Sequence, residues 1–509
     1  MRWQPDPTTL AFVRLLALPV MLAWVGTRHL LAWSLRHPLT AILLLAAVLR
    51  LGALTALYPS LFAFETTGAV HGSESFDRYA QNLLAARVYG LQPGIPDATL
   101  PPFYSAFLAL VYAVLGRSGW AVGIVHMLLD LASIWLLYRI GAALFVRVTL
   151  RWRTVGLIGA LAYACYPYLI FQNLTLIDTP LFMLILHGFV YVLILLRERM
   201  RFDAGGWRLA ALAGMLLGAG MLLRPVLAPL AVLIALWFLT RRTLPQTILR
   251  LLPVAAIGAL IVLPWSLRNT AIFGTFVPIA LNGGGNLYQG NNPDVVPFLR
   301  AGYDTQWTSP EGAGAVPDSE RHTPQGDQAL ADAAWAYLRA NPAAIPELLW
   351  VKFWTHWSID VFPRQNPKPG ERPLIDQVRQ TEQNGQLALE GVDAGDPVTV
   401  YDTPLFDVIG RWLHRMYFGA WFGPALLGFA LSLRYPRELG ILGLIQLNMT
   451  MVYMFFHPST RYRSPTDPLL FLFSAYALIW LWQAWRKRRQ PISLNTLGAT
   501  SQTSLPRSG

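Results

Sequence analysis

Apolar runs of roughly 20 residues recur along this 509-residue chain, and short arginine-rich stretches separate many of them. A helix of about 20 apolar residues is long enough to cross the hydrocarbon layer of a bilayer. Hydrophobic residues make up 54% of the chain and charged residues only 13%, against about one quarter in a soluble domain. The sequence therefore argues against a soluble enzyme and predicts an all-α polytopic membrane protein.

Ten of these runs are expected to span the membrane. They lie at 39–58, 119–146, 154–172, 179–196, 208–223, 226–240, 249–266, 415–433, 438–456 and 467–485. Two other apolar stretches break the pattern. Residues 8–34 contain Arg14 and Arg28, which favours an interfacial helix over a span, and residues 102–116 are short for a crossing, which favours a re-entrant or interfacial segment.

The formal net charge of +12 is an average over two unlike parts of the chain. Residues 267–410 hold nine basic and 17 acidic residues, a net charge of −8, and the remaining residues hold 31 and 11, a net charge of +20. A nucleic-acid-binding protein would place its basic residues on a polar domain, but here they follow the apolar runs. By the positive-inside rule the arginine-rich side faces the cytoplasm, so both termini are expected there in a cell inner membrane.

This topology divides the chain into five regions. They are a cytoplasmic interfacial helix at 1–38, a transmembrane catalytic core at 39–266 with an external loop at 59–118, an extracytoplasmic domain of mixed structure at 267–410, C-terminal transmembrane helices at 411–485, and a disordered cytoplasmic tail at 486–509. Polar chemistry is expected on the external face. The single cysteine, Cys165, excludes a disulfide within the chain.

The first external loop predicts an amphipathic helix along the outer surface, ending near Gly90. Its apolar positions share one face at helical spacing: Ala80, Leu83, Leu84 and Val88. Asp77 and Arg78 lie in its first turn, beside the membrane, where a carboxylate is costly unless it is paired or used. Asp77 is therefore either the N-cap of this helix or a functional acid.

Asp178 is likewise either a helix cap or a functional acid. It precedes Thr-Pro at the start of an expected span, and an aspartate in that position is a common helix start. External arginines are few and occur at Arg224, Arg268, Arg461 and Arg463. A guanidinium at the outer boundary can extend to water without a function, but it also matches the geometry of a phosphate.

Two further patterns are weaker. The glycine-rich run at 282–292 lacks the Lys-Ser/Thr ending of a nucleotide loop, which favours a substrate-lining turn. His126 and Asp130 are four residues apart on one face of a span, which fits a proton relay or, more simply, a hydrogen-bonded pair.

Taken together, these features resemble the membrane-embedded glycosyltransferases of the C-type fold, among them the bacterial relatives of protein O-mannosyltransferases and of the lipid A aminoarabinose transferase, which are similar to glycosyltransferase family 39. The resemblance rests on an ordered set of short segments: Asp-Arg-Tyr-Ala at 77–80, Pro-Pro-Phe-Tyr at 101–104, Asp178, Leu-Arg-Pro at 223–225, Pro-Trp-Ser-Leu-Arg-Asn at 264–269, the run at 282–292, and Arg-Tyr-Arg-Ser-Pro at 461–465.

The resemblance implies a polyprenyl-phosphate-linked sugar as donor, transfer on the external face with inversion, and a key acid in the first external loop. That acid corresponds to Asp77. Many members have an Asp-Glu pair three or four residues before the tyrosine, but this sequence has Ser75 and Phe76 there, which leaves Glu74 as a rival. Asp178 is the third candidate for catalysis. The expected substrate-binding and phosphate-binding residues are Arg78, Tyr79, Asp97, Arg224, Arg268, Asn269, Arg461 and Arg463.

The expected partners are the lipid-linked donor, membrane lipids and an acceptor that is a lipid, a glycan or a protein; nucleic acid is not expected. A divalent metal is compatible with this chemistry but not required, because arginine alone can neutralise a monophosphate leaving group. The main alternative is a transporter or flippase of lipid-linked sugars. Transporters gather polar groups at the membrane midplane and often show repeated halves, whereas these charges lie at the external ends of the runs.

Overall fold

The computed structural model describes residues 33–68, 70–305, 316, 320, 323–364 and 404–489, with no side-chain description for 404–407. This part of the chain consists of helices and connecting segments, and it contains isolated β-bridges but no strand. The all-α polytopic architecture is thereby confirmed. Most of the interfacial helix expected at 1–38, residues 365–403 of the expected external domain and tail residues 490–509 lie outside the described residues.

Six described spans are long and apolar enough to cross a membrane. They are built on α2 (Pro38–Leu57), α6 (Gly119–Phe145), α9 (Thr179–Glu198), α12 (Leu244–Phe273), α19 (Pro436–Phe455) and α21 (Asp467–Arg489). The other expected spans coincide with shorter or more polar helices: α7 (Trp152–Ala164) with α8 (Pro167–Gln172), α10 (Ala204–Met221), α11 (Leu230–Leu239) and α18 (Pro404–Ser432). A total of ten crossings stays a prediction.

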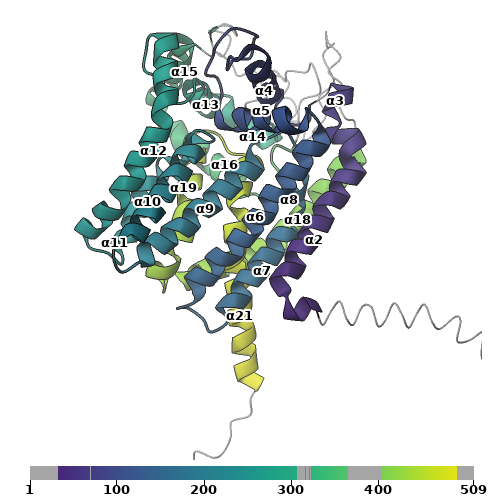
Figure 1. Cartoon of the computed structure of the whole chain (residues 1–509), viewed down its shortest axis with the longest axis vertical. Helices are drawn as coiled ribbons and strands as arrows, with labels where there is room; N and C mark the ends of the chain where they lie inside the picture. Colours follow the sequence, from purple (N-terminus) through teal and green to yellow (C-terminus); the bar gives the residue numbers. More distant parts are fainter. Residues whose placement is uncertain are drawn as a thin grey trace, which may run out of the picture.

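The two ends of the bundle differ in structure. Short helices gather at one end, which we call the loop end: α4 (Glu74–Ala86), α5 (Phe103–Leu115), α13 (Gly283–Gly290), α14 (Val295–Ala301), α15 (Pro324–Ala340) and α16 (Ile345–His356) (Figure 1). At the opposite end, α2 begins and α21 ends (Figure 1). The described part of the domain expected at 267–410 consists of helices and connecting segments, without a strand.

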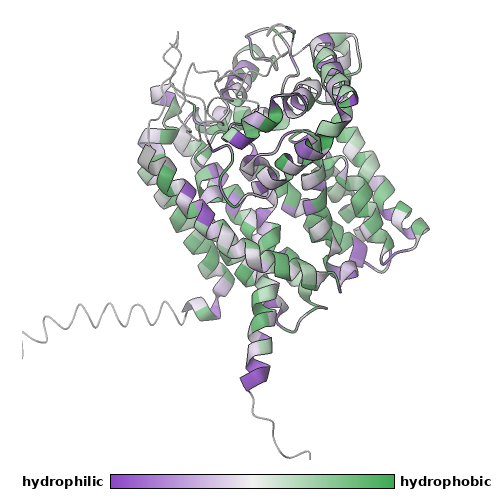
Figure 2. Cartoon of the chain, turned by 180° about the vertical axis from the view of Figure 1, so that it is seen from behind, coloured by the Kyte–Doolittle hydropathy of each residue, from purple (hydrophilic) through white to green (hydrophobic). Residues whose placement is uncertain are grey.

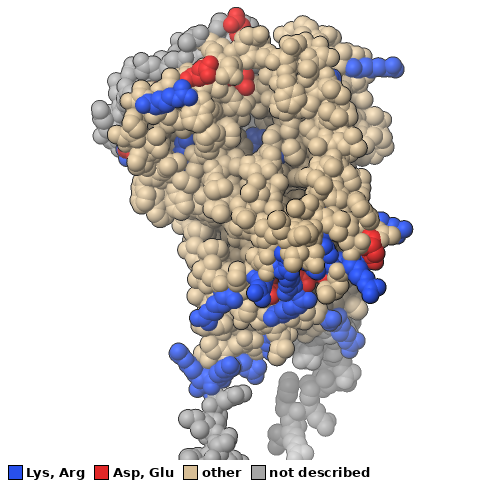
Figure 3. Space-filling model, turned by 90° about the vertical axis from the view of Figure 1, so that its left-hand side faces the viewer, with Lys and Arg blue, Asp and Glu red and all other residues tan. Residues whose placement is uncertain are grey.

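Hydropathy and charge follow this division. The long helices are mainly hydrophobic along the middle of the bundle (Figure 2). Lysine and arginine side chains gather near the end opposite the loop end, below a broad surface with few charges (Figure 3). This distribution is that of a multi-pass membrane protein.

Several arginines at the basic end also close helix termini. Arg197 donates to the carbonyl of Trp237. Arg242 and Arg250 both donate to the carbonyl of Arg199, and Arg242 also donates to the carbonyl of Arg197. The last carbonyls of a helix have no partner inside the helix, and lipid offers none. These arginines therefore stabilise helix ends in addition to fitting the expected orientation.

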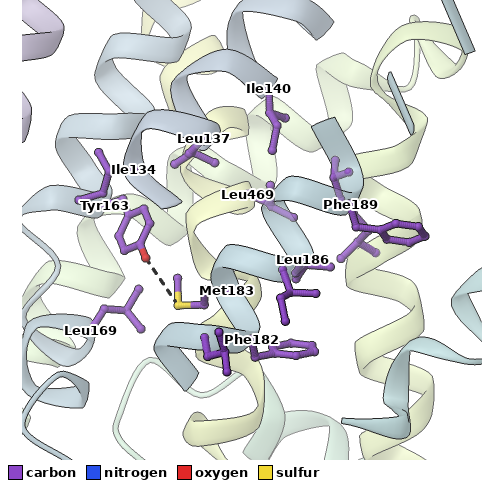
Figure 4. Packing of buried hydrophobic residues seen from close by; sticks show 14 of the residues in the cluster. Ile134, Leu137, Ile140, Tyr163, Leu169, Phe182, Met183, Leu186, Phe189 and Leu469 are labelled. Carbon is purple, nitrogen blue, oxygen red and sulfur yellow. Dashed lines mark hydrogen bonds between the residues drawn. The ribbon is translucent and has the colours of Figure 1, made fainter. Parts of the chain in front are cut away.

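Close helix packing positions the core. Around Tyr163, side chains from α6, α7, α8, α9 and α21 interlock, and the Tyr163 hydroxyl contacts the sulfur of Met183 at 3.7 Å (Figure 4). Between α10 and α12 the contact is closer still, because a Cβ added at Gly218 would lie 2.8 Å from the carbonyl oxygen of Gly258 and 2.6 Å from Ile261. Small residues permit this approach of two backbones, which is how membrane helices associate.

Local expectations change at two places. α4 begins at Glu74 and ends at Ala86, four residues before the stop expected at Gly90, and Arg87 takes the left-handed conformation with φ of 54°. The glycine-rich run forms helix α13 and not the expected turn, and the carboxylate of Asp327 accepts from its first free N–H groups, those of Gly284 and Gly285.

Replacing Gly218 with alanine tests the α10–α12 contact. We expect Gly218→Ala to lower the free energy of unfolding by about 1–3 kcal/mol, because overpacking a tight contact forces the helices apart. Denaturant unfolding in detergent measures it. Gly52→Ala is the matched control, because nothing lies within 4 Å of a Cβ at that helical position. Equal stability of the two variants would contradict the assigned packing.

Candidate functional site

Asp77 is the centre of a buried polar cluster at the loop end, which we call the Asp77 cluster. Its carboxylate accepts two bonds from Arg117, with Nη2 at 2.7 Å and Nε at 3.1 Å. The Tyr112 hydroxyl and the Gln81 amide each donate at 2.8 Å. Ser73, and not Asp77, is the N-cap residue of α4, so the capping interpretation of Asp77 is wrong.

Arg117, Tyr112 and Gln81 were not among the residues expected from the sequence, and Arg117 is the charged one of the three. It lies between α5 and α6, and its guanidinium also stacks over the Phe64 ring at 4.9 Å. The hydrogen bond to Asp77 raises the pKa of Arg117, and burial followed by the Asp77 charge raises the pKa of Tyr112. Arg117 is a lone arginine between two apolar helices, and this context was the only sequence signal that could have pointed to it.

Glu74 and Arg78 lie apart from this cluster. They form an i,i+4 ion pair on the outer face of α4, with Arg78 Nη2 2.6 Å from Glu74 Oε1 and both side chains more than half exposed. Exposed pairs of this kind contribute about 0.2–1 kcal/mol. In this conformation Arg78 does not meet the other phosphate candidates, and Glu74 is open to solvent.

Tyr79, Asp97 and Arg268 form a second group, which ties the loop after α4 to α12. The Tyr79 hydroxyl and the N–H of Leu91 donate to the Asp97 carboxylate. Arg268 donates to the main-chain carbonyls of Asp97 and Tyr89 at 2.6 and 2.9 Å. The polar groups of these three residues bond within the protein in the described conformation. They fasten the segment after α4 to α12.

Asn269 and Arg463 are also used internally. The Asn269 amide donates to the carbonyls of Val277 and Ile279. The buried Arg463 pairs with Asp467 at 3.1 Å and donates to the carbonyl of His356. Arg463 Nη2, like one donor each of Arg224 and Arg461, is shielded from solvent without a hydrogen-bond partner.

Asp178 and Arg224 form another buried ion pair of the loop end. Arg224 Nε and Nη2 each lie 2.6 Å from one oxygen of Asp178, and Nη2 also donates to the Thr179 hydroxyl at 3.0 Å. Asp178 occupies the N-cap position of α9 but makes no side-chain cap bond. Although burial raises the pKa of Asp178, the charge and hydrogen bonds of Arg224 hold it below its usual value.

Arg461 lies close to this pair and adds a further positive charge. Its charge contributes to the lowered pKa of Asp178, and both Asp178 and Arg461 act on the buried hydroxyl of Tyr104, whose pKa burial raises. In the described part of the chain, Arg461 Nε and Arg224 Nη1 are shielded from solvent without a hydrogen-bond partner. We call Asp178, Arg224, Arg461 and Tyr104 the Asp178 cluster.

Tyr104 relates the two clusters to each other. Its ring meets the ring of Phe76, the neighbour of Asp77, edge to face at 4.9 Å. Tyr112 of the Asp77 cluster also acts on the Tyr104 hydroxyl. The structure therefore brings Asp77, Asp178, Arg224 and Arg461 into one region, although they lie far apart in the sequence.

Unpaired guanidinium donors indicate what this region can bind. Buried polar groups are nearly always hydrogen-bonded, so a shielded donor without a partner points to a water, an ion or a ligand. Two arginines beside one carboxylate provide a net positive site suited to a phosphate group. Within the described residues no group of three or more His, Cys, Asp or Glu side chains could hold a metal ion.

Comparison with known proteins confirms the resemblance expected from the motifs. Residues 99–267 match the family described as dolichyl-phosphate-mannose-protein mannosyltransferase. This segment runs from α5 into α12, and it contains Tyr104, Asp178 and Arg224. The chain is thus similar to the membrane glycosyltransferases of the C-type fold. A comparison with curated protein sequences finds no match.

Solved structures with a similar course of the chain include two proteins. The oligosaccharyltransferase AglB of Archaeoglobus fulgidus, in complex with an inhibitory peptide and a dolichol-phosphate, is 13% identical with a TM-score of 0.49, over 93% of this chain and 53% of that one. ArnT of Cupriavidus metallidurans, bound to undecaprenyl phosphate, is 12% identical with a TM-score of 0.35, over 85% and 76%. The chain thus spans about half the length of AglB.

A double-mutant cycle measures the pair at the centre of the Asp77 cluster. We expect Asp77→Asn and Arg117→Gln each to lower the free energy of unfolding by about 1–3 kcal/mol, because each leaves a largely buried partner short of a charged bond. The double variant should lose less than the two losses added, with a coupling of about 0.5–3 kcal/mol. Additive losses would show that the pair is not formed.

Acid titration tests the Asp178–Arg224 pair. The native carboxyl has the lower pKa and binds fewer protons than in the unfolded chain. Its stabilisation is therefore present above the unfolded pKa of about 3.9 and is lost as the pH falls through the native pKa. Asp178→Asn should be about 3–5 kcal/mol less stable than wild type at pH 7, because Arg224 is left buried without a countercharge.

The same measurement at lower pH gives the decisive comparison. Below about pH 4 the stability difference between wild type and Asp178→Asn should narrow, because protonation removes the charge that the substitution removes. Glu347→Gln is the control, since Glu347 pairs with Arg300 on the surface with both side chains about half exposed. A difference that stays constant down to pH 2 would contradict the pairing.

Proposed function

We propose that this protein is a membrane glycosyltransferase that transfers a sugar from a polyprenyl-phosphate-linked donor to an acceptor at the extracytoplasmic face, with inversion. The observation that carries the proposal is the pair of shielded, unpartnered guanidinium donors of Arg224 and Arg461 beside Asp178. The family match over residues 99–267 supports the reaction class. The arginine-rich opposite end supports the extracytoplasmic location.

The proposed chemistry assigns one task to each cluster. The acceptor oxygen attacks the anomeric carbon while the bond from that carbon to the lipid phosphate breaks, and the leaving phosphate gains negative charge. Arg224 and Arg461 stabilise that charge from fixed positions in a shielded site, where such stabilisation is strongest. A carboxylate takes the proton of the acceptor hydroxyl.

We assign the proton transfer to Asp77, acting directly or by orienting the accepting group. Arg117, Tyr112 and Gln81 hold its carboxylate at a defined position within the loop end. Glu74, on the exposed face of α4, and Asp178, bound bidentately by Arg224, are the two carboxylates to be compared with it. The sugar and the acceptor are left open.

A reconstituted assay with labelled polyprenyl-phosphate sugar tests the donor site. We expect Arg461→Gln to lower kcat/KM for the donor by about tenfold to hundredfold, because a hydrogen bond to a charged group contributes about 1.5–3 kcal/mol. Arg300→Gln, at an exposed ion pair of the same end, should leave the rate unchanged. Equal rates for the two variants would remove Arg461 from the donor site.

The same assay distinguishes transfer from transport and ranks the carboxylates. Release of free lipid phosphate only when acceptor is present indicates transfer, whereas movement of intact donor across the bilayer would support the transporter. Asp77→Asn should lower kcat far more than Arg117→Gln, which breaks the same ion pair but keeps the carboxylate. Similar losses in both would show that Asp77 serves only to pair with Arg117.

A further inference from the structure

A charged pair lies buried between the long helices, outside both clusters. Arg50 of α2 donates from Nε to Asp130 of α6 at 2.7 Å, and the two side chains are 0% and 2% exposed. Burying two charges costs several kcal/mol each, and well-packed apolar residues are often as stable or more stable in the same place. Ionisable groups inside membrane helices usually serve a function, so this pair needs a reason beyond stability.

The partners of Asp130 indicate that reason. Its Oδ1 accepts from the Tyr163 hydroxyl at 2.5 Å, and its Oδ2, which is bonded to Arg50, also accepts from the Asn173 amide at 2.9 Å. Arg50 in turn donates from Nη1 to the carbonyl of Ala164, the last residue of α7. The pair therefore bonds to the segment that follows α7 as well as to the two helices that carry it.

Asn173 opens the segment 173–178, which we call the site loop because it ends at Asp178. The Asn173 amide also donates to the carbonyl of Leu169 at 2.9 Å, and its own carbonyl lies 3.2 Å from His126 Nδ1. The other ring nitrogen of His126 lies 3.0 Å from the Tyr104 hydroxyl. Asn173 thus joins His126 to Asp130, in place of the direct pair that their spacing suggested.

The site loop also holds the entry to α4. The N–H of Leu176 donates to the carbonyl of His71 at 2.8 Å, and the N–H of Ser73 donates to the carbonyl of Leu176 at 3.1 Å. Gly72 lies so close that an added Cβ would be 2.8 Å from the backbone of Leu176. One loop therefore connects the buried pair to Asp178 on one side and to the helix of Asp77 on the other.

We propose that Arg50, Asp130 and Asn173 are positioning residues, which hold the site loop so that Asp178 and the start of α4 keep the geometry of the donor site. The proposal rests on the proposed function for its catalytic consequence. The pair contributes an anchor: lipid does not solvate the two charges, so separating them is costly, and Asn173 is bonded to the carboxylate that they hold in place. A misplacement of about 1 Å at a reacting centre costs on the order of hundredfold in rate.

Two variants and a matched control test this. Asn173→Leu keeps the size of the side chain and removes its bonds to Asp130 and to the Leu169 carbonyl, whereas the double variant Arg50→Leu/Asp130→Leu removes both charges and keeps the Leu169 bond. Tyr163→Phe removes another buried bond to Asp130 but leaves the loop untouched. Hydrogen exchange of the Leu176 amide reports the loop, and kcat with KM for labelled polyprenyl-phosphate sugar reports the site.

We expect Asn173→Leu and the double variant to accelerate exchange of the Leu176 amide about tenfold or more and to lower kcat/KM by about tenfold to hundredfold. Tyr163→Phe should stay within about twofold of wild type in both. Unchanged hydrogen exchange at Leu176 in the double variant would overturn the proposal, because apolar residues could then replace the pair without affecting the site loop.

The outcomes for the two proposals are separable. If wild type transfers no sugar, the proposed function fails, while the exchange data still decide whether the pair orders the loop. If Asn173→Leu does not fold, Asn173→Ser, which is too short to reach Asp130, takes its place. Faster exchange throughout α10 and α12 as well as the loop would show a general loss of stability and would also count against positioning.

Discussion

Lipid offers no hydrogen bonds, so each charged side chain inside the bundle needs a partner within the protein. Arg50 pairs with Asp130, Arg224 with Asp178, and Arg463 with Asp467. Other arginines at the basic end bond to helix-terminal carbonyls. Several of these arginines keep a shielded donor without a partner, which is costly, and those of Arg224 and Arg461 lie together beside Asp178.

The two clusters of the loop end differ in how fully they are satisfied. The Asp77 carboxylate accepts four bonds from three side chains, so its position is defined before any substrate binds. The Asp178 cluster has excess positive charge and open donors. One cluster is thus suited to hold a carboxylate at a defined place, and the other to accept an anion. Tyr104, between them, is anchored through His126 to the site loop.

The long helices could be predicted from the sequence, because apolar length is a local property that the bilayer selects. The presence of Asp178, Arg224 and Arg461 at one region also followed from their places at helix ends. The contacts of Arg78 and Arg268 could not be predicted, because a snorkelling arginine, a loop-closing arginine and a ligand-binding arginine have the same sequence context. Arg117 was missed because its partner, Asp77, is 40 residues away, so nothing in its own sequence context indicates the contact.

The sequence by itself determined the class of protein: its apolar runs require a helical membrane protein, and its arginines indicate the orientation. Only the tertiary structure decided which polar groups meet. Asp77 could cap its helix or pair with Arg117, and the packing of α5 against α4 selects the pair. Asp178 could cap α9, but its carboxylate bonds to Arg224 and makes no cap bond. Such choices depend on contacts between distant segments, where small differences in distance decide which charge is satisfied.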